Sequence, residues 1–297
     1  MAKRTLHIPA NMAGLRLDQA LTALVPDLSR RGARALIQAG AVYLGGRRCR
    51  TASKFVQAGV QVGLEQSLPR RQRADPVEVS ILWEGEGILA LDKPAGVPFA
   101  PTRLAVEGSL LYALARRLGR PMNQLYPVHR LDTPTSGVVL VALTAKAAGF
   151  LGDALAQGRV HKTYLAWVAG TPGPPEGEWT WPLSSVEGGR VRVDVDGRPA
   201  VSLYRVLDAR GGESFLELRP LTGRTHQLRA HCAAARCPIA GDKTYGGPLT
   251  APRALLHAWR IVFPLPGGGE QAVEAPVPED MKREQGAGSR EQGAGSR

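Results

Sequence analysis

The feature that most constrains the fold is a series of short apolar segments typical of β-strands, which fills most of the chain after residue 77. Helical spacing is expected at only three places there, 108–118, 144–156 and 225–235. Because several strands follow one another without an intervening helix, we expect an α+β domain over 77–280 with a mixed, mainly antiparallel sheet. The strand segments are V-E-V-S-I-L-W (77–83), I-L-A-L-D (88–92), G-V-V-L-V-A-L (137–143), T-Y-L-A-W-V (163–168), A-V-S-L-Y-R-V (200–206) and F-L-E-L-R-P (215–220).

The first quarter of the chain has a different pattern, in which two short helices precede two strands. Ser29 is expected to cap the second helix and Gly40 to end it. A Gly-Gly pair predicts a tight turn at the end of the first strand. We therefore expect a small α/β module over residues 12–65. Its helices are expected at 15–25 and 29–40, and its strands at 41–50 and 56–62.

Two further segments lie outside these domains. Residues 66–76 contain two prolines among polar and charged residues, a composition typical of a linker. Near the end, E-Q-G-A-G-S-R occurs twice in succession at 284–297, without an apolar residue larger than Ala. Such a segment buries too little surface to offset its ordering entropy, so we expect a disordered tail over 281–297.

Positive charge is concentrated in the N-terminal part of the chain. The formal net charge is +12, and residues 1–76 hold 13 Lys and Arg against 4 Asp and Glu, which gives +9 there and +3 in the remainder. A localised excess of this size favours a polyanionic partner over a merely solvated basic surface.

Several classes of protein are disfavoured by the sequence. No apolar stretch reaches the roughly 20 residues that span a bilayer, and the first residues lack a secretory signal, so we expect a cytoplasmic protein without a membrane partner. Three cysteines do not make a disulfide framework. Cys232 and Cys237 lie near His226 and His231, but without a C-x-x-C pair they are weak metal ligands. No Walker loop, G-x-G-x-x-G or H-E-x-x-H occurs, so we expect neither a cofactor nor a catalytic metal.

Three polar segments are candidates for a functional site. The loop H-R-L-D-T-P-T-S-G at 129–137 holds Asp132 just before a buried strand, although an Asp near a Pro is commonly a turn residue. In L-T-G-R-T-H-Q-L-R-A-H at 221–231, Thr225 is the expected helix cap, and the helix start favours anions unless it is an ordinary capped helix. Tyr164 lies in an alternating strand, where a tyrosine usually serves packing.

Taken in order, these and neighbouring segments resemble the RluA-type family of RNA pseudouridine synthases over nearly the whole of 77–265. The resemblance implies a pseudouridine synthase fold with a central active-site cleft, and isomerisation of uridine in RNA without redox chemistry or group transfer. The segments are L-D-K-P-A-G-V-P (91–98), H-R-L-D-x-x-T-S-G (129–137), K-T-Y (162–164), G-R-T-H-Q-L-R-x-H (223–231), P-I-x-G-D-K-x-Y-G (238–246) and L-L-H-A (255–258). The loop F-A-P-T-R-L at 99–104 departs from the pattern because it lacks the His-Pro pair common there.

The resemblance also implies roles for individual residues. Asp132 would act in its ionised form, as a nucleophile or as a base. Arg224 is hypothesised to pair with it and keep it charged. Tyr164 would stack on the target uracil and help to move the proton lost from carbon 5. Arg130 would enter the position that the extruded base leaves.

The N-terminal module resembles the ribosomal-protein-S-four-type RNA-binding module, on the pattern R-L-D-x-x-L, S-R-x-x-x-x-x-L-I-x-x-G-x-V and a Gly turn before a basic residue. A generic basic helical hairpin is the alternative. The expected RNA contacts are Arg30, Arg31, Arg34, Arg47 and Arg48, to which the anion-favouring helix start adds Arg229.

The expected partner is a structured RNA, and the appended module within this family points to large-subunit ribosomal RNA, with transfer RNA second. The default oligomeric state is a monomer. Two rival functions stay open at this point: a non-catalytic RNA-binding or ribosome-assembly protein, and a hydrolase that releases free uracil.

Overall fold

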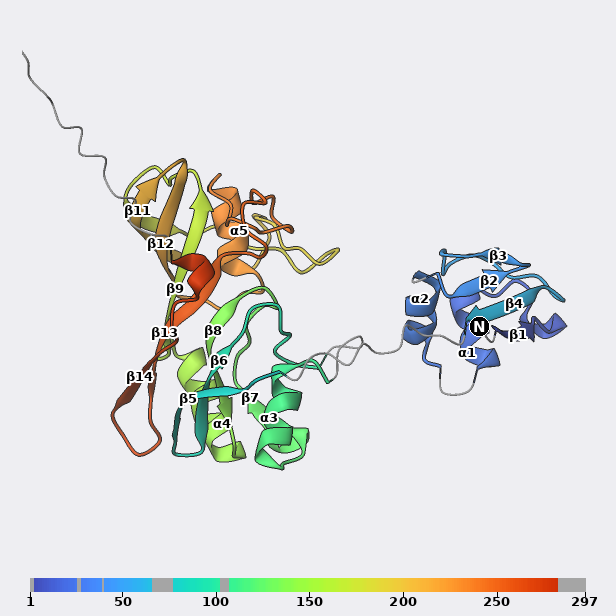
Figure 1. Cartoon of the computed structure of the whole chain (residues 1–297), viewed down its shortest axis with the longest axis horizontal. Coiled ribbons are helices and arrows are strands. Elements are labelled where there is room, and N and C mark those ends of the chain that lie inside the picture. Colours follow the sequence, from blue (N-terminus) through green and yellow to red (C-terminus); the bar gives the residue numbers. More distant parts are fainter. Residues whose placement is uncertain (1–2, 26–27, 39, 66–76, 102–106, 283–297) are drawn as a thin grey trace, which may run out of the picture. The chain divides into compact units, whose positions relative to one another are not determined.

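The structure, a computed structural model, describes residues 3–25, 28–38, 40–65, 77–101 and 107–282. The chain divides into two compact units, Met1–Ala74 and Asp75–Arg297, which are described separately below (Figure 1). The expected linker at 66–76 and the repeated segment at 284–297 lie outside the described residues, so both assignments stay predictions.

The N-terminal unit packs two helices against a four-stranded antiparallel sheet of order β1-β4-β2-β3. Gly45 and Gly46 have φ of 57° and 79° and form the predicted turn between β2 and β3. Ser29 Oγ accepts a hydrogen bond from Gly32 N at 3.1 Å, as expected of a capping residue. The elements are β1 (Lys3–His7), η1 (Ala10–Met12), α1 (Leu17–Leu24), α2 (Arg30–Gln38), β2 (Val42–Leu44), β3 (Arg47–Arg48) and β4 (Gln61–Glu65).

Two details of this unit differ from the prediction. Strand β1 begins before residue 12 and pairs with β4. The strand predicted at 56–62 is wrong for most of its length, because Gly59 has φ +74° and turns the chain before β4 begins at Gln61. The valines at 56, 60 and 62 therefore span a turn and the beginning of a strand, and do not lie in one continuous strand.

The C-terminal unit is built on a sheet of order β10-β11-β12-β9-β13-β8-β6-β5, with β14 paired to β13 and β7 to β8 (Figure 1). Of the named strand pairs, all are antiparallel except β13 with β8, which confirms the expected mixed, mainly antiparallel α+β fold. Its elements are β5 (Ser80–Gly85), β6 (Ile88–Lys93), α3 (Leu110–Leu118), η2 (Met122–Gln124), β7 (Tyr126–Pro127), β8 (Ser136–Ala142), α4 (Ala145–Ala156), β9 (His161–Ala169), β10 (Glu176–Trp179), β11 (Ser202–Arg210), β12 (Glu213–Pro220), α5 (Gln227–Ala234), β13 (Leu256–Pro264), β14 (Glu270–Glu274) and η3 (Glu279–Met281).

Strand β13 occupies the middle of the sheet, between β8 and β9. Its contact with β8 depends on Gly137, which has φ +109°, because a Cβ at that position would lie 2.2 Å from the carbonyl oxygen of Ala258. The pairing brings the start of β8 beside the start of β13. The residues just before β8, which include the loop around Asp132, are therefore held at the middle of the sheet.

Helices α3 and α4 begin at the residues that the sequence predicts within two positions. Ser109 Oγ accepts from Tyr112 N at 3.4 Å, and Thr144 Oγ1 accepts from Ala147 N at 3.1 Å. Both helices contribute to the main core. All seven residues of β8 are buried, and five of them, from Val138 to Ala142, belong to that core.

The end of the described chain packs against the sheet as far as Met281, a residue that was expected to belong to the disordered tail. Met281 is buried, and its carbonyl oxygen accepts a hydrogen bond from Trp167 Nε1 at 2.9 Å. The predicted boundary of the disordered tail is therefore too early. Within the described residues, no helix is both long and apolar enough to cross a bilayer.

Candidate functional site

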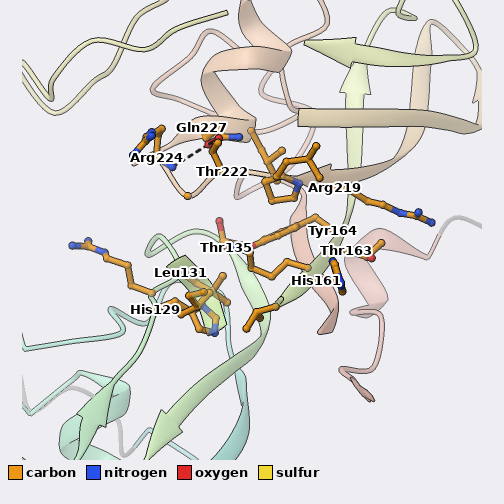
Figure 2. Close-up of a pocket in the computed structure, with 18 of the residues that line it drawn as sticks. His129, Leu131, Thr135, His161, Thr163, Tyr164, Arg219, Thr222, Arg224 and Gln227 are labelled. Carbon is orange, nitrogen blue, oxygen red and sulfur yellow. Dashed lines mark hydrogen bonds between the residues drawn. The ribbon is translucent and has the colours of Figure 1, made fainter. Parts of the chain in front are cut away.

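A cavity of about 1060 Å³ opens between the loop that precedes β8, the start of β9, and the loop from β12 to α5 (Figure 2). Asp132 is the one carboxylate among the described residues that line it. Because the other charged side chains that line it are cationic, the cavity attracts an anion. The six arginines and lysines that line it are Arg130, Lys162, Arg219, Arg224, Arg229 and Arg260.

The loop that carries Asp132 is fixed by side chains on both sides of it. His129 Nε2 accepts from Leu140 N of β8 at 3.0 Å, and burial lowers the pKa of His129 to about 3, so the ring is neutral. On the other side, the fully buried Lys93 Nζ donates to three backbone carbonyls, among them that of Thr133 at 3.2 Å. Burial lowers the pKa of Lys93 to about 7, whereas its three acceptors favour the charged ammonium. Lys93 lies in the L-D-K-P segment, but no local pattern there predicts that its side chain supports the Asp132 loop.

Arg229, on α5, pairs with Asp132. Its Nη1 lies 3.1 Å from Asp132 Oδ2. The same guanidinium is held by Asp242, with Nε 2.7 Å from Oδ2 and Nη2 2.8 Å from Oδ1. Burial pushes the pKa of Asp242 up, but the hydrogen bonds and charge of Arg229 outweigh it and hold that pKa below its usual value. Asp242 thus keeps one end of the guanidinium turned toward Asp132.

This arrangement corrects the expectation for Arg224. Its Nε donates to the carbonyl oxygen of Pro199 at 2.9 Å, and among the described residues it makes no ion pair with Asp132. Figure 2 shows its side chain on the wall opposite Tyr164 and turned away from it. Arg229, expected to bind RNA phosphates, has a side chain only 5% exposed and is committed to two carboxylates, so it is not placed for that contact.

The N-cap of α5 lies one residue after Thr225, the predicted cap. His226 takes the N-cap position in the left-handed region, with φ 54°. The loop before it is held by Gln227, whose Oε1 accepts from Arg224 N at 3.0 Å and from Thr222 Oγ1 at 2.7 Å. The predicted hydroxyl cap is therefore wrong: among the described residues no side chain caps the first turn of α5, and the Gln227 amide instead closes the loop that precedes it.

Tyr164 lies on β9, lines the cavity and is 9% exposed. Burial raises the pKa of its phenol, and the charge of Asp132 raises it further, so the hydroxyl keeps its proton. Lys162, two residues earlier, also lines the cavity, and burial lowers its pKa. Asp132 and Tyr164, two of the residues predicted for catalysis, thus reach the same cavity.

Arg130 is exposed and lines the cavity beside Asp132. Its position gives it access both to solvent and to the site. The geometry is compatible with the predicted role in base extrusion, which stays a prediction.

Three arginines of the N-terminal unit gather around a buried carboxylate. Asp18 is fully buried and pairs with Arg16 at 3.1 Å, Arg30 at 3.5 Å and Arg34 at 2.6 Å. Burial opposes its ionisation, but the hydrogen bonds from Arg34 and Arg16 bring its pKa to about 2. The guanidiniums of Arg30 and Arg34 stay about half exposed, so phosphates can still reach them.

The other predicted RNA contacts of this unit lie at the β2–β3 turn. Arg47 and Arg48 are exposed there, and Arg48 Nη2 donates to Tyr43 Oη at 2.7 Å. The side chain of Arg31 lies outside what the structure describes.

Comparison with known proteins gives a consistent result for both units. Residues 87–234 match the RNA pseudouridylate synthase family, and residues 15–62 match the S4 domain. A relative named ribosomal large subunit pseudouridine synthase D, from Xanthomonas campestris pv. campestris, is 35% identical, with 94% of this chain and 91% of the relative covered. A protein of the same name from Nitrosomonas europaea is 34% identical, over 93% of this chain and 85% of that protein.

Solved structures agree. Human RNA pseudouridylate synthase domain containing 1 is 27% identical, with a TM-score of 0.57 over 67% of this chain and 83% of that one. Human RNA pseudouridylate synthase domain containing 4 is 25% identical, with a TM-score of 0.56 over 67% and 89%. These similarities extend over the segments that carry Asp132, Tyr164 and Arg229. The chain belongs to the RluA-type family of RNA pseudouridine synthases and carries an S4 domain at its N-terminal end.

Proposed function

We propose that Asp132 carries out the isomerisation of uridine to pseudouridine in large-subunit ribosomal RNA. The bond between ribose carbon 1′ and uracil nitrogen 1 breaks, the uracil turns, and carbon 5 bonds to carbon 1′. Carbon 5 then loses its proton and nitrogen 1 gains one, so the reaction needs no second substrate. The observation that carries this proposal is a single carboxylate, held by Arg229 at 3.1 Å, in a cavity lined by cationic side chains.

Asp132 has the properties that either of its possible roles requires. Attack on the nucleotide and removal of a ribose proton both need the ionised carboxylate. Arg229 favours that form, because a cation at this distance stabilises the charge. Asp242 makes the support rigid, since it binds the other end of the same guanidinium through two hydrogen bonds.

Tyr164 and Arg130 are proposed to handle the base. The ring of Tyr164 lines the cavity and offers a flat face on which the uracil stacks. Its phenol keeps its proton in the resting enzyme. It can therefore take up the proton from carbon 5 only if its own proton moves on to Asp132 or to the RNA. Arg130 is exposed beside them, and its long planar side chain suits the space that the extruded base leaves in the RNA helix.

Ribosomal RNA is proposed as the substrate on two grounds. The relatives described above are named for the large ribosomal subunit, and the N-terminal S4 domain exposes Arg30, Arg34, Arg47 and Arg48 to bind RNA phosphates. We also propose that the enzyme works as a monomer, and in the cytoplasm, where ribosomal RNA is modified in bacteria. Transfer RNA is the alternative substrate.

The test is a map of pseudouridines in RNA from cells that lack the protein and are complemented with wild type or Asp132→Asn. Pseudouridines are labelled chemically and read as stops of reverse transcription. We expect one or more stops in large-subunit RNA that wild type restores and Asp132→Asn does not. Restoration by Asp132→Asn would overturn the role of Asp132, and stops restored only in transfer RNA would overturn the substrate. Release of free uracil in vitro would show a hydrolase instead.

A further inference from the structure

His226 has an unusual backbone conformation, and its side chain does not make the hydrogen bond expected at its position in the helix. It begins α5 with φ 54°, a conformation that costs free energy in most residues other than glycine. At an N-cap the side chain usually accepts a hydrogen bond from the first turn, but that of His226 makes no such bond. The imidazole is 18% exposed and turns toward other partners.

The two ring nitrogens of His226 face two different groups. Nε2 lies 3.7 Å from Asp132 Oδ2, the oxygen that also contacts Arg229. Nδ1 lies 3.1 Å from the hydroxyl of Tyr245. That hydroxyl accepts a hydrogen bond from Val191 N at 3.0 Å. A continuous line of contacts thus leads from the backbone near Val191 to the proposed catalytic carboxylate.

The direction of hydrogen bonding along this line determines the tautomer of the imidazole. Among the described residues, the Tyr245 hydroxyl has no recorded acceptor other than His226 Nδ1, so its own proton points there. Nδ1 is then the acceptor and Nε2 carries the hydrogen. The opposite tautomer would turn a lone pair of Nε2 toward the carboxylate of Asp132, which is repulsive.

Burial keeps the imidazole of His226 neutral, and the charges around it act in both directions. Burial lowers the pKa of His226, Asp132 and Asp242 oppose that effect, and Arg229 and Arg130 add to it, with a net decrease. Burial also raises the pKa of Tyr245, so its hydroxyl remains protonated. A neutral ring can donate from Nε2 to the carboxylate without competing with Arg229 as a second cation.

We propose that His226 is a positioning residue: its ring, held as the Nε2–H tautomer by Tyr245, donates to Oδ2 of Asp132 and leaves Oδ1 to react with the uridine. Among the described residues, no contact to Oδ1 is recorded, whereas Oδ2 faces both Arg229 and His226. The separation of 3.7 Å is longer than a hydrogen bond, and catalytic hydrogen bonds commonly tighten when substrate binds. This inference rests on the proposed role of Asp132.

The first test compares two amides at position 226. The amide nitrogen of glutamine reaches the place of Nε2 and can donate to Asp132, whereas that of asparagine reaches only the place of Nδ1. In single-turnover reactions on the mapped ribosomal RNA fragment, we expect His226→Asn to lower the rate constant about tenfold or more, the loss typical of a missing hydrogen bond to a charged group. His226→Gln should recover most of that loss, and the RNA Kd should stay unchanged in both variants.

A second variant tests the hydroxyl that sets the tautomer. Tyr245→Phe keeps the ring, over which Arg229 and Arg190 lie at 5.2 and 5.5 Å from the centroid, and removes only the hydroxyl. We expect a smaller loss than for His226→Asn, and a double variant no slower than His226→Asn alone. Tyr112→Phe on α3 is the matched control and should leave the rate unchanged. A wild-type rate for His226→Asn, or losses that multiply in the double variant, would overturn the inference.

A third measurement does not depend on activity. In protein labelled with ¹⁵N-histidine, the ring signal that His226→Gln removes should have the shifts of the Nε2–H tautomer, and Tyr245→Phe should move it. An Nδ1–H signal for that ring would overturn the inference, even if the Asn variant failed to fold. Failure of the proposed function is distinguishable, because Asp132→Asn would then stay active, whereas here Asp132→Asn is inactive and only the His226 results disagree.

Discussion

Arg229 Nη1 lies 3.1 Å from Asp132 Oδ2, while Asp242 binds the opposite end of the same guanidinium at 2.7 and 2.8 Å. The two carboxylates share one buried cation, which therefore cannot leave Asp132 without breaking two other charged hydrogen bonds. Because a buried guanidinium is costly to leave unpaired, all three groups are coupled in folding as well as in catalysis.

This coupling predicts different results for the two arginines near the site. Arg229→Lys keeps the charge but cannot bind Asp242 through two nitrogens and reach Asp132 as well, so we expect a loss of roughly 100-fold in single-turnover rate. Arg224→Lys, whose Nε bonds to a backbone carbonyl, should lose far less. Rates are measured by quenched reactions on the mapped RNA fragment. Equal losses in the two variants would refute the assignment of the pair.

Tyr164→Phe separates stacking from proton transfer. The variant keeps the ring that lines the cavity and removes the phenol, whose pKa is raised by burial. If the phenol helps to move the proton from carbon 5, the rate falls about 100-fold or more, the usual contribution of a positioned acid or base, at unchanged RNA Kd. Filter binding measures Kd, and a fully active variant would show that only the ring matters.

Arg130→Ala tests base extrusion through the choice of substrate. Extrusion from a helix costs a few kcal/mol, and a short single strand avoids most of that cost. We therefore expect the variant to lose much more rate on a folded ribosomal RNA fragment than on a short single-stranded oligonucleotide with the same uridine. The same loss on both substrates would mean that Arg130 acts on bound uracil rather than on the helix.

The S4 domain predicts a change in salt dependence. Arg47 is exposed on the turn between β2 and β3, so Arg47→Ala should reduce the slope of log affinity against log salt by about 0.7 to 0.9 if it neutralises one phosphate. Lys146→Ala, at the exposed start of α4, is the control and should keep the slope. Titrations of RNA at several salt concentrations give the two slopes.

Buried histidines predict how the stability of the C-terminal unit depends on pH. Burial lowers the pKa of His257 from the ordinary 6.5 to about 4, with Nδ1 2.9 Å from Ser136 Oγ. The unfolded chain therefore takes up a proton that the folded one refuses between pH 6.5 and 4, so this stability is complete above pH 6.5 and is lost as the pH falls. The expected loss at pH 4 is about 3 kcal/mol.

Urea unfolding at several pH values, followed by tryptophan fluorescence, measures this effect. All five tryptophans lie in the C-terminal unit, so the signal reports that unit. His257→Gln should flatten the dependence on pH, whereas His7→Gln, on β1 of the other unit, should leave it as it is. A wild-type slope in His257→Gln would show that other groups dominate acid unfolding.

Much of the fold could be predicted because local patterns agreed with the final structure. The apolar run at 137–143 forms most of β8, and α3 and α4 begin within two residues of the predicted helices at 108–118 and 144–156. Strand β13 is central but is not among the predicted strands, because only its first residues belong to a motif, L-L-H-A. Its place between two earlier strands depends on the close approach at Gly137, which is a tertiary contact.

The site could be predicted only in part. The loop of Asp132 and the strand of Tyr164 followed from motif and resemblance, and both residues line the cavity. The partner of Asp132 did not follow, because Arg224 and Arg229 lie in one motif and only the start of α5 at Gln227 decides which of them faces inward. Asp242 lies in the G-D-K part of a family motif, but no local sequence pattern predicts that its side chain binds Arg229 of α5.

The central place of β13 has a consequence for the synthesis of the enzyme. Strands β8 and β9 leave the ribosome well before β13, and until it arrives each lacks its neighbour on one side. The loop of Asp132 is anchored at the point where β8 meets β13, so a nascent chain that ends before residue 256 lacks that anchor. The S4 domain, complete long before, can therefore hold RNA at a time when the rest of the polypeptide is still inert.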